Sequence, residues 1–574
     1  MRIRRHSSPS PPGIARRLIA SKPWLSILTS TRSKLEVSKA NHHQKLRRIY
    51  GRERKRSLSP ISDFSACHAP DMPVWESSEK DSREERRGRF FSLDTMTSSA
   101  LPTDWRGIGL GPIRKLPEGV LLEIFDLCRV SSKSHMTYTW PWKRLVHVCR
   151  KWRCVVFASP RRLDLRLFCN SKTPVRKTLD IWPALPIIIQ SDGRTSFKLK
   201  LCNNDDGDNI YAALERRDRV CKIELKNLTS SLLTKITAVM QEPFPALTDL
   251  CLSSDDDALP VLPDEFLGGS APNLQCFELD GIPFPALPNL LSSSTHLVRL
   301  RIRRMPQSGH ISPVAMATCL AALPSLESLF LEFQSPQSRP SQDNRHPPPS
   351  RRVVLPALTI FDFRGVNNYL EDLVAQIDAP QLNCVTSRFF NQLTFDNTQL
   401  SRFINRTEML KSSSRAELEF LSDVAKITLS SPGGRGKLEL EISSYQPDWQ
   451  VSSMARLCDQ LSTPISRVQQ LVVRKGCMPR FKWPVDMDCT QWLELFNPFV
   501  AVEMLGIEKL GQLVVPAFHK LTGESATGVL PSMRTLSFGG LGSLNAPARI
   551  KVDLQSFVSA RQSSNRPVSV IWGA

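Results

Sequence analysis

The chain has 574 residues, of which 41% are hydrophobic and 23% charged, a composition typical of globular proteins. It contains no run of about 18 apolar residues, so the sequence predicts no transmembrane helix and no membrane partner. The formal net charge is +21, but residues 1–60 alone carry sixteen Lys and Arg against Glu36 and Glu53. Because the remainder is only mildly basic, the charge does not require a nucleic-acid surface, and we do not expect nucleic acid as a partner.

The fourteen cysteines are scattered along the chain, without a C-x-x-C pair or a Cys/His spacing that suits zinc. In the absence of a secretory signal, this usage is typical of a reduced intracellular protein. We therefore expect a cytoplasmic or nuclear location, no metal and no cofactor.

Residues 1–110 are rich in Ser, Arg and Pro and lack sustained periodicity, which predicts a disordered basic tail. Three interpretations of this tail stay open. Residues 1–35 contain no acid, as in mitochondrial transit peptides, and residues 51–57, GRERKRS, fit a nuclear-import signal. The third interpretation is a plain solvated tail.

Ordered structure is predicted to begin with IRKLPEGVLLEIFDLC, residues 113–128. Pro117 suits the first turn of a helix because its missing N–H is not needed there, and Glu118 suits the positive end of the helix dipole. Apolar residues from Val120 to Cys128 then recur at helical spacing. We predict a short amphipathic helix that opens a helical domain over residues 111–165.

A polar spacer separates this helix from WPWKRLVHVCRKWRCVVFASP, residues 140–160. Its apolar residues, from Trp142 to Val156, recur at three- and four-residue steps, with basic residues on the opposite side. The segment is predicted to form one helix or a pair of short helices that end before Pro160.

A repeated phrase follows beyond residue 195, in which Pro often precedes an L-x-x-L-x-L core. Its leading leucines recur at steps of 23 to 32 residues and are Leu247, Leu274, Leu297, Leu326, Leu358 and Leu382. VCKIEL at 220, VEMLGI at 502 and PSMRTLSF at 531 extend the series. This period is the signature of leucine-rich repeats, whose units bury their leucines only by stacking on one another. The predicted class is α/β, with an irregular leucine-rich-repeat-like solenoid and a curved parallel sheet over residues 166–574.

Two loop insertions are expected in this array. Residues 332–352 are Pro-rich and should loop out, and the repeat frame is lost over residues 386–467. Inside the second insertion, AKITLSSPGGRGKLELEISS at 425–444 predicts two strands joined by a Gly-rich turn.

Motifs of common catalytic sites are missing from the sequence, including G-x-S-x-G, H-E-x-x-H and the phosphate-binding loop. We therefore expect no enzymatic activity. NNDDGDN at 203–209 and SSDDDA at 253–258 gather oxygen ligands that calcium favours, but neither has the spacing of a calcium loop. We interpret both as solvated acidic loops that could contact a basic partner.

LPEGVLLEIFDLC (116–128) and WKRLVHVCRKWRCVVFASPRRLDLRLFC (142–169) together resemble the F-box, with its L-P pair, its I-F pair and its V-C-R-x-W string in order. With TPVRKTLDIWPALPI (173–187), they resemble the F-box-like form of basidiomycete fungi in particular. Two features depart from the common pattern: Gly119 stands in the first helical turn, and a spacer from Arg129 to Pro141 replaces a compact link.

The resemblance implies a three-helix domain that docks on a Skp-type adaptor and, through it, on a cullin and a RING ubiquitin ligase. The adaptor contacts that it implies are Leu116, Pro117, Leu121, Ile124, Phe125, Leu145, Val148, Cys149 and Trp152. The repeats would then bind an unknown target protein for ubiquitin-dependent degradation.

The alternative is a leucine-rich-repeat interaction scaffold that is not linked to ubiquitination, in which the helices cap the first repeat. Full coverage of Leu116, Phe125 and Trp152 by the repeats would favour the cap, and an exposed apolar patch would favour docking. Outward strand positions are weaker candidates for target contact, namely Asp249, Glu278, Arg299, Arg301, Glu327 and Glu332. Their mixed charges indicate no target class.

Overall fold

The computed structural model describes residues 116–131, 141–191, 204–256, 259–334, 351–390, 397–431, 433–444, 447–476, 488–521, 525–539 and 548–573. All of them belong to Ile108–Ala574, one of the two units into which the chain divides. The tail expected over residues 1–110 and most of the loop expected over 332–352 lie outside the described residues.

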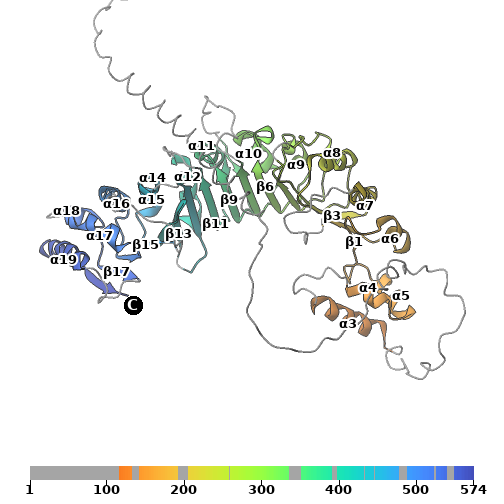
Figure 1. The fold of residues 1–574 in the computed structure, drawn as a ribbon, viewed down its shortest axis with the longest axis horizontal. Helices are drawn as coiled ribbons and strands as arrows, with labels where there is room; N and C mark the ends of the chain where they lie inside the picture. Colours follow the sequence, from red (N-terminus) through yellow and green to blue (C-terminus); the bar gives the residue numbers. More distant parts are fainter. Residues whose placement is uncertain are drawn as a thin grey trace, which may run out of the picture. The chain divides into compact units, whose positions relative to one another are not determined.

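Sixteen strands form one sheet (Figure 1). In spatial order they are β1 (Leu167–Cys169), β2 (Ile187–Gln190), β3 (Val220–Leu225), β4 (Asp249–Ser253), β5 (Cys276–Asp280), β6 (Arg299–Met305), β7 (Ser328–Phe333), β9 (Ile360–Gly365), β11 (Cys384–Phe389), β14 (Lys437–Ser443), β13 (Val424–Ser430), β12 (Arg415–Phe420), β15 (Gln470–Lys475), β16 (Met504–Glu508), β17 (Thr535–Gly539) and β18 (Ser569–Trp572). All neighbouring pairs are parallel except the two that involve β13. β8 (Val353–Val354) and β10 (Ile377–Asp378) form a separate two-stranded sheet.

Helices connect most of the strands, and consecutive helices such as α9, α10 and α11 contact one another. The helices are α3 (Glu118–Ser131), α4 (Pro141–Val146), α5 (Arg150–Ala158), α6 (Val175–Ile181), α7 (Asn204–Leu214), α8 (Ser230–Val239), α9 (Leu287–Ser292), α10 (Pro313–Ala321), α11 (Asn367–Val374), α12 (Thr398–Arg406), α13 (Glu408–Lys411), α14 (Pro447–Gln460), α15 (Ser462–Ile465), α16 (Thr490–Phe496), α17 (Gly511–His519), α18 (Ser525–Gly528) and α19 (Ala548–Ser563), with 3-10 turns at Phe266–Gly269 and Gln307–Gly309. None of the helices in the described ranges is long and apolar enough to span a membrane. The fold is mixed α/β, with a long and mainly parallel sheet.

The six predicted repeat frames each supply a strand that begins two residues after the leading leucine. In the first frame, Leu247 precedes β4, and Leu250 and Leu252 of that strand are buried with it. Alternation of inward and outward side chains along the strand places both leucines on the helix side of the sheet. The leucine frame is thus confirmed as the source of the core.

Residues 386–467 are not a loop insertion, and this expectation was wrong. The chain passes through α12 and α13 to β12, then returns through β13 and β14, so that β14 lies beside β11 and β12 beside β15. The two predicted strands and their Gly-rich turn are confirmed as β13 and β14. β12, β13 and β14 therefore belong to the main sheet, where each of them is paired along both edges.

The acidic stretch 203–209 is also not a loop, since α7 begins at Asn204. Acidic residues near a helix N-terminus complement the helix dipole. In the second acidic stretch, Asp256 accepts hydrogen bonds from the Ser230 backbone N–H at 3.0 Å and the Ser230 hydroxyl at 3.3 Å, at the start of α8. Asp256 of the second stretch therefore helps to fix the start of α8.

A fully buried arginine connects the last helix, α19, to the segment that precedes β17. Arg561 of α19 donates hydrogen bonds to the carbonyl oxygens of Ala526 (3.2 Å), Leu530 (3.4 Å) and Met533 (2.8 Å). Burial lowers the pKa of its guanidinium, and neighbouring Arg566 lowers it further. Arg561 thus supplies buried hydrogen-bond donors to carbonyl groups of the preceding segment.

Candidate functional site

The three helices α3, α4 and α5, here called the helical module, pack around an apolar interior. Leu121 and Phe125 of α3 are buried, as are Val146 of α4 and Val156 of α5. The Phe125 and Trp152 rings meet edge to face with centroids 4.9 Å apart, a favourable arrangement for aromatic pairs. The wide apolar face predicted for α3 therefore serves partly to hold the module itself.

Polar contacts fix the start of α5. The Trp152 backbone N–H donates to Cys149 Sγ at 3.5 Å, so the cysteine takes the position of a helix cap. Lys151 Nζ donates to the carbonyl oxygen of Leu116 at 2.8 Å and ties α5 to the residues that precede α3. α4 and α5 form the predicted pair of short helices. Lys151, which the sequence pattern placed on the polar side of the segment, joins this pair to the start of α3.

The nine residues predicted to contact the adaptor divide by burial. Leu121 and Phe125 are buried, Pro117 and Val148 are exposed, and Leu116, Ile124, Leu145, Cys149 and Trp152 are half-buried. The assignment of Leu121 and Phe125 as surface contacts is corrected, because their side chains already pack inside the module. Val120, which the nine omit, is 44% exposed, close to the 48% of Val148.

The module also contacts the first units of the array through one tryptophan. Trp182, which follows α6, lies against Trp142 with centroids 5.3 Å apart, against Phe157 at 6.1 Å and against His147 at 6.2 Å. All three contacts are edge to face. The module residues in these contacts, Trp142, His147 and Phe157, are not among the nine predicted to bind the adaptor.

A second candidate surface is the side of the sheet opposite the helices, here called the polar face. Four predicted target-contact residues lie on it in adjacent strands: Asp249 on β4, Glu278 on β5, and Arg299 and Arg301 on β6. The four line a hollow of about 470 Å³ that extends over β3 to β6. Alternation along parallel strands in register brings these residues together, as the sequence frame predicted.

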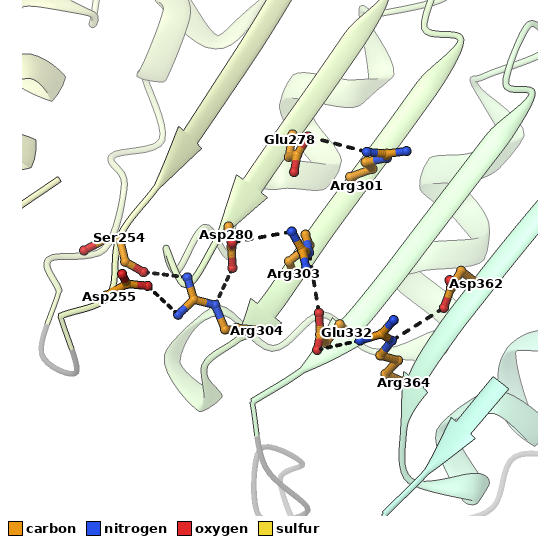
Figure 2. Close-up of polar contacts among 10 residues, drawn as sticks. All are labelled: Ser254, Asp255, Glu278, Asp280, Arg301, Arg303, Arg304, Glu332, Asp362 and Arg364. Atoms are coloured by element: carbon orange, nitrogen blue, oxygen red, sulfur yellow. Dashed lines mark hydrogen bonds and ion pairs between the residues drawn. The ribbon is translucent and has the colours of Figure 1, made fainter. Parts of the chain in front are cut away.

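Ion pairs run across the polar face from strand to strand (Figure 2). Arg303 lies 3.8 Å from Asp280 and 3.7 Å from Glu332, and Glu332 lies 3.6 Å from Arg364. Phe330 lies between the guanidinium groups of Arg303 and Arg364, at 5.6 and 5.4 Å from its ring centroid. These alternating charges connect β5, β6, β7 and β9 and include Glu332, a predicted contact.

A bulge in β6 directs a further arginine to the end of this network. Arg304 has a positive φ of 46° and donates to Asp280 at 2.5 Å, to Asp255 at 2.8 Å and to the Ser254 carbonyl oxygen at 2.9 Å. The acidic stretch at 253–258 thus meets a basic partner inside the chain itself (Figure 2). The run RLRIRR was the sequence signal, but alternation alone would place Arg304 with the core.

Glu327 does not belong to the polar face, so its place among the outward strand positions was wrong. It precedes β7, and its backbone N–H donates to the Val298 carbonyl oxygen at 2.8 Å while its own carbonyl accepts from Thr359 N–H at 2.9 Å. These bonds belong to the backbone ladder that joins successive units just before their strands.

Burial perturbs two titratable groups on the polar face. It raises the pKa of the Asp362 carboxyl from 3.8 to about 6, although nearby Arg364 acts in the opposite direction. Burial also raises the pKa of the Cys251 thiol to about 11, so this thiol stays protonated and weakly nucleophilic at neutral pH. Within the described ranges, no three His, Cys, Asp or Glu side chains are grouped so that they could hold a metal ion.

Comparison with known proteins finds similarity to solved structures. No protein-family model matches the chain. No curated protein matches it. The crystal structure of the leucine-rich repeat-containing protein LegL7 from Legionella pneumophila is similar at a TM-score of 0.23 and 11% sequence identity, over 68% of this chain and 97% of that one.

Proposed function

We propose that the chain is the substrate-recognition subunit of a Skp–cullin–F-box type ubiquitin ligase. The helical module binds a Skp-type adaptor, and the repeat array holds a target protein. The chain itself catalyses no step. It raises the local concentration of target lysines near the ligase that carries the ubiquitin.

One observation carries the proposal: the strings that resemble the F-box form a module of short helices whose surface keeps apolar side chains in solvent. Val120 and Val148 are about half exposed, and Leu116 and Trp152 are half-buried. Apolar side chains of this kind each contribute about 1.5 to 3 kcal/mol when a partner covers them fully. Coverage by an adaptor groove would follow the helix-in-groove mode of recognition.

The rival is an interaction scaffold in which the module only caps the array. The packing of Trp182 on Trp142 and Phe157 favours this second candidate, because it covers apolar surface at the first repeat. Leu116, Phe125 and Trp152 do not separate the two candidates, since Phe125 is buried and the other two side chains are partly exposed. The two candidates differ in what the exposed valines do.

The test is capture of the full chain on a purified, immobilised Skp-type adaptor. We expect Val120→Asp/Val148→Asp to lower the affinity at least 30-fold, because two carboxylates would be placed in an apolar contact. The matched control is Val314→Asp/Val552→Asp, which changes two similarly exposed helical valines in the repeats. Leu116→Ala/Pro117→Ala should also reduce capture.

Since both changed valines are exposed in the parent, circular dichroism should show all variants folded. Equal capture of the parent, the control and both module variants would refute the ligase proposal. Absence of capture for the folded parent would do the same, and would leave the scaffold.

A further inference from the structure

We propose that the polar face over β3 to β6 binds an extended, acidic segment of the target protein, with the arginines of β6 as its main contacts. This inference rests on the proposed function, in which the repeat array holds the target, and it adds the chemistry of what is held.

The first observation is that the cations around the hollow are more exposed to solvent than the anions. Arg301 and Arg303 expose 44% and 43% of their side chains, whereas Glu278 and Asp280 expose 27% and 15%. Lys226, directly after β3, is 52% exposed, and its partner Glu224 on β3 is 19% exposed. The short carboxylates therefore lie at the floor of the hollow, and the longer cations form the layer that an incoming ligand meets.

The second observation concerns which cations are free to take another partner. Arg303 is engaged by Asp280 and Glu332, whereas Arg301 has a single ion-pair partner among the described residues, Glu278 at 3.9 Å (Figure 2). None of the described residues supplies a hydrogen-bond acceptor to the buried Arg301 Nε–H. Arg299 is exposed, and within the described part of the chain its guanidinium donates to Cys276 Sγ at 3.9 Å. Both guanidinium groups can thus donate hydrogen bonds to carboxylates of a ligand while the ion pairs of Arg303, Arg304 and Arg364 in Figure 2 stay in place.

The third observation is spacing. Arg299, Arg301 and Arg303 occupy alternate positions of one strand, so they recur about every 6.6 Å along it. An extended peptide that runs along β6 with an acid at every second residue repeats at the same distance. Guanidinium groups bind carboxylates through paired hydrogen bonds, which makes this match specific. The hollow of about 470 Å³ gives room for such a segment over the floor of carboxylates.

The experiment measures binding of a fluorescein-labelled decapeptide of alternating Glu and Ser to the full chain, by fluorescence anisotropy at low salt. We expect saturable binding that weakens with added salt, and no binding of the corresponding Gln/Ser peptide. Arg299→Gln/Arg301→Gln should raise the Kd about tenfold, as expected from the loss of two exposed charged contacts. Arg415→Gln/Arg467→Gln, which removes two exposed arginines elsewhere in the array, should leave the Kd unchanged.

Equal binding of the acidic and neutral peptides, or an equal loss in both double variants, would overturn the inference. Tighter binding of a labelled oligothymidylate at the same arginines would overturn it as well, since the occupant would then be a nucleic acid. Adaptor capture is measured in parallel on the same variants. If the parent chain captures the adaptor but does not bind the acidic peptide, only this inference is refuted. If the parent binds the peptide but does not capture the adaptor, only the ligase proposal is refuted.

Discussion

Replacement of Trp182 by alanine should loosen the helical module from the repeat array. Trp182 makes three edge-to-face contacts, with Trp142, His147 and Phe157, at centroid distances of 5.3 to 6.2 Å. Each such pair contributes about 0.5 to 1.5 kcal/mol beyond its buried area. The three pairs together contribute about 1.5 to 4.5 kcal/mol. Because Trp182 is only half-buried, we expect a loss in the lower part of this total, about 2 to 3 kcal/mol.

Amide hydrogen exchange measures this loss directly, because it reports local opening rather than global unfolding. Exchange in α4 and α5 should become roughly 30- to 150-fold faster in Trp182→Ala, while exchange in β4 to β7 stays constant. Trp449→Ala, at an exposed position of α14, is the control and should change neither region. Unchanged exchange in α4 and α5 would refute the idea that Trp182 attaches the module.

Two further predictions concern stability. Arg561→Met removes the side-chain donor that three buried carbonyl oxygens share, so it should destabilise the C-terminal repeats by about 3 kcal/mol in urea unfolding. Arg566→Gln, at an exposed arginine that bonds a single carbonyl, should cost less than about 1 kcal/mol. Asp362 has a folded pKa of about 6 against an ordinary value of 3.8, so its contribution to stability is complete below about pH 4 and is lost as the pH rises through 6. In Asp362→Asn, the loss of unfolding free energy between about pH 4 and pH 7 should be smaller than in the parent by up to about 2 kcal/mol. An identical pH profile of stability in the parent and the variant would contradict the raised pKa of Asp362.

The repeats were predictable because each unit carries its own local signal. Leu247, Leu250 and Leu252 show the L-x-x-L-x-L spacing in the sequence, and the same three side chains enter the core in the structure. The position of β12 to β14 in the main sheet was not predictable in this way. It depends on pairing of β14 with β11 and of β12 with β15, and no local pattern encodes such distant partners.

The candidate sites were less predictable, because periodicity shows that a face is apolar and does not show what covers it. Phe125 and Val120 lie on the same short helix and are both apolar, yet the first is buried and the second is 44% exposed. The prediction for Glu327 was wrong for a related reason. Glu327 directly follows the leading leucine Leu326, and the strand begins one residue later, at Ser328. Arg304 was missed because a bulge, which the sequence does not reveal, reverses its direction.

The most direct test of the central claim is amide hydrogen exchange of the full chain with and without a saturating, purified Skp-type adaptor. We predict slower exchange in α3, at residues 145–150 and in α5, with Val120→Asp/Val148→Asp abolishing the effect. Protection that falls on the repeats while the helical module exchanges as before, or no protection anywhere, would contradict the account.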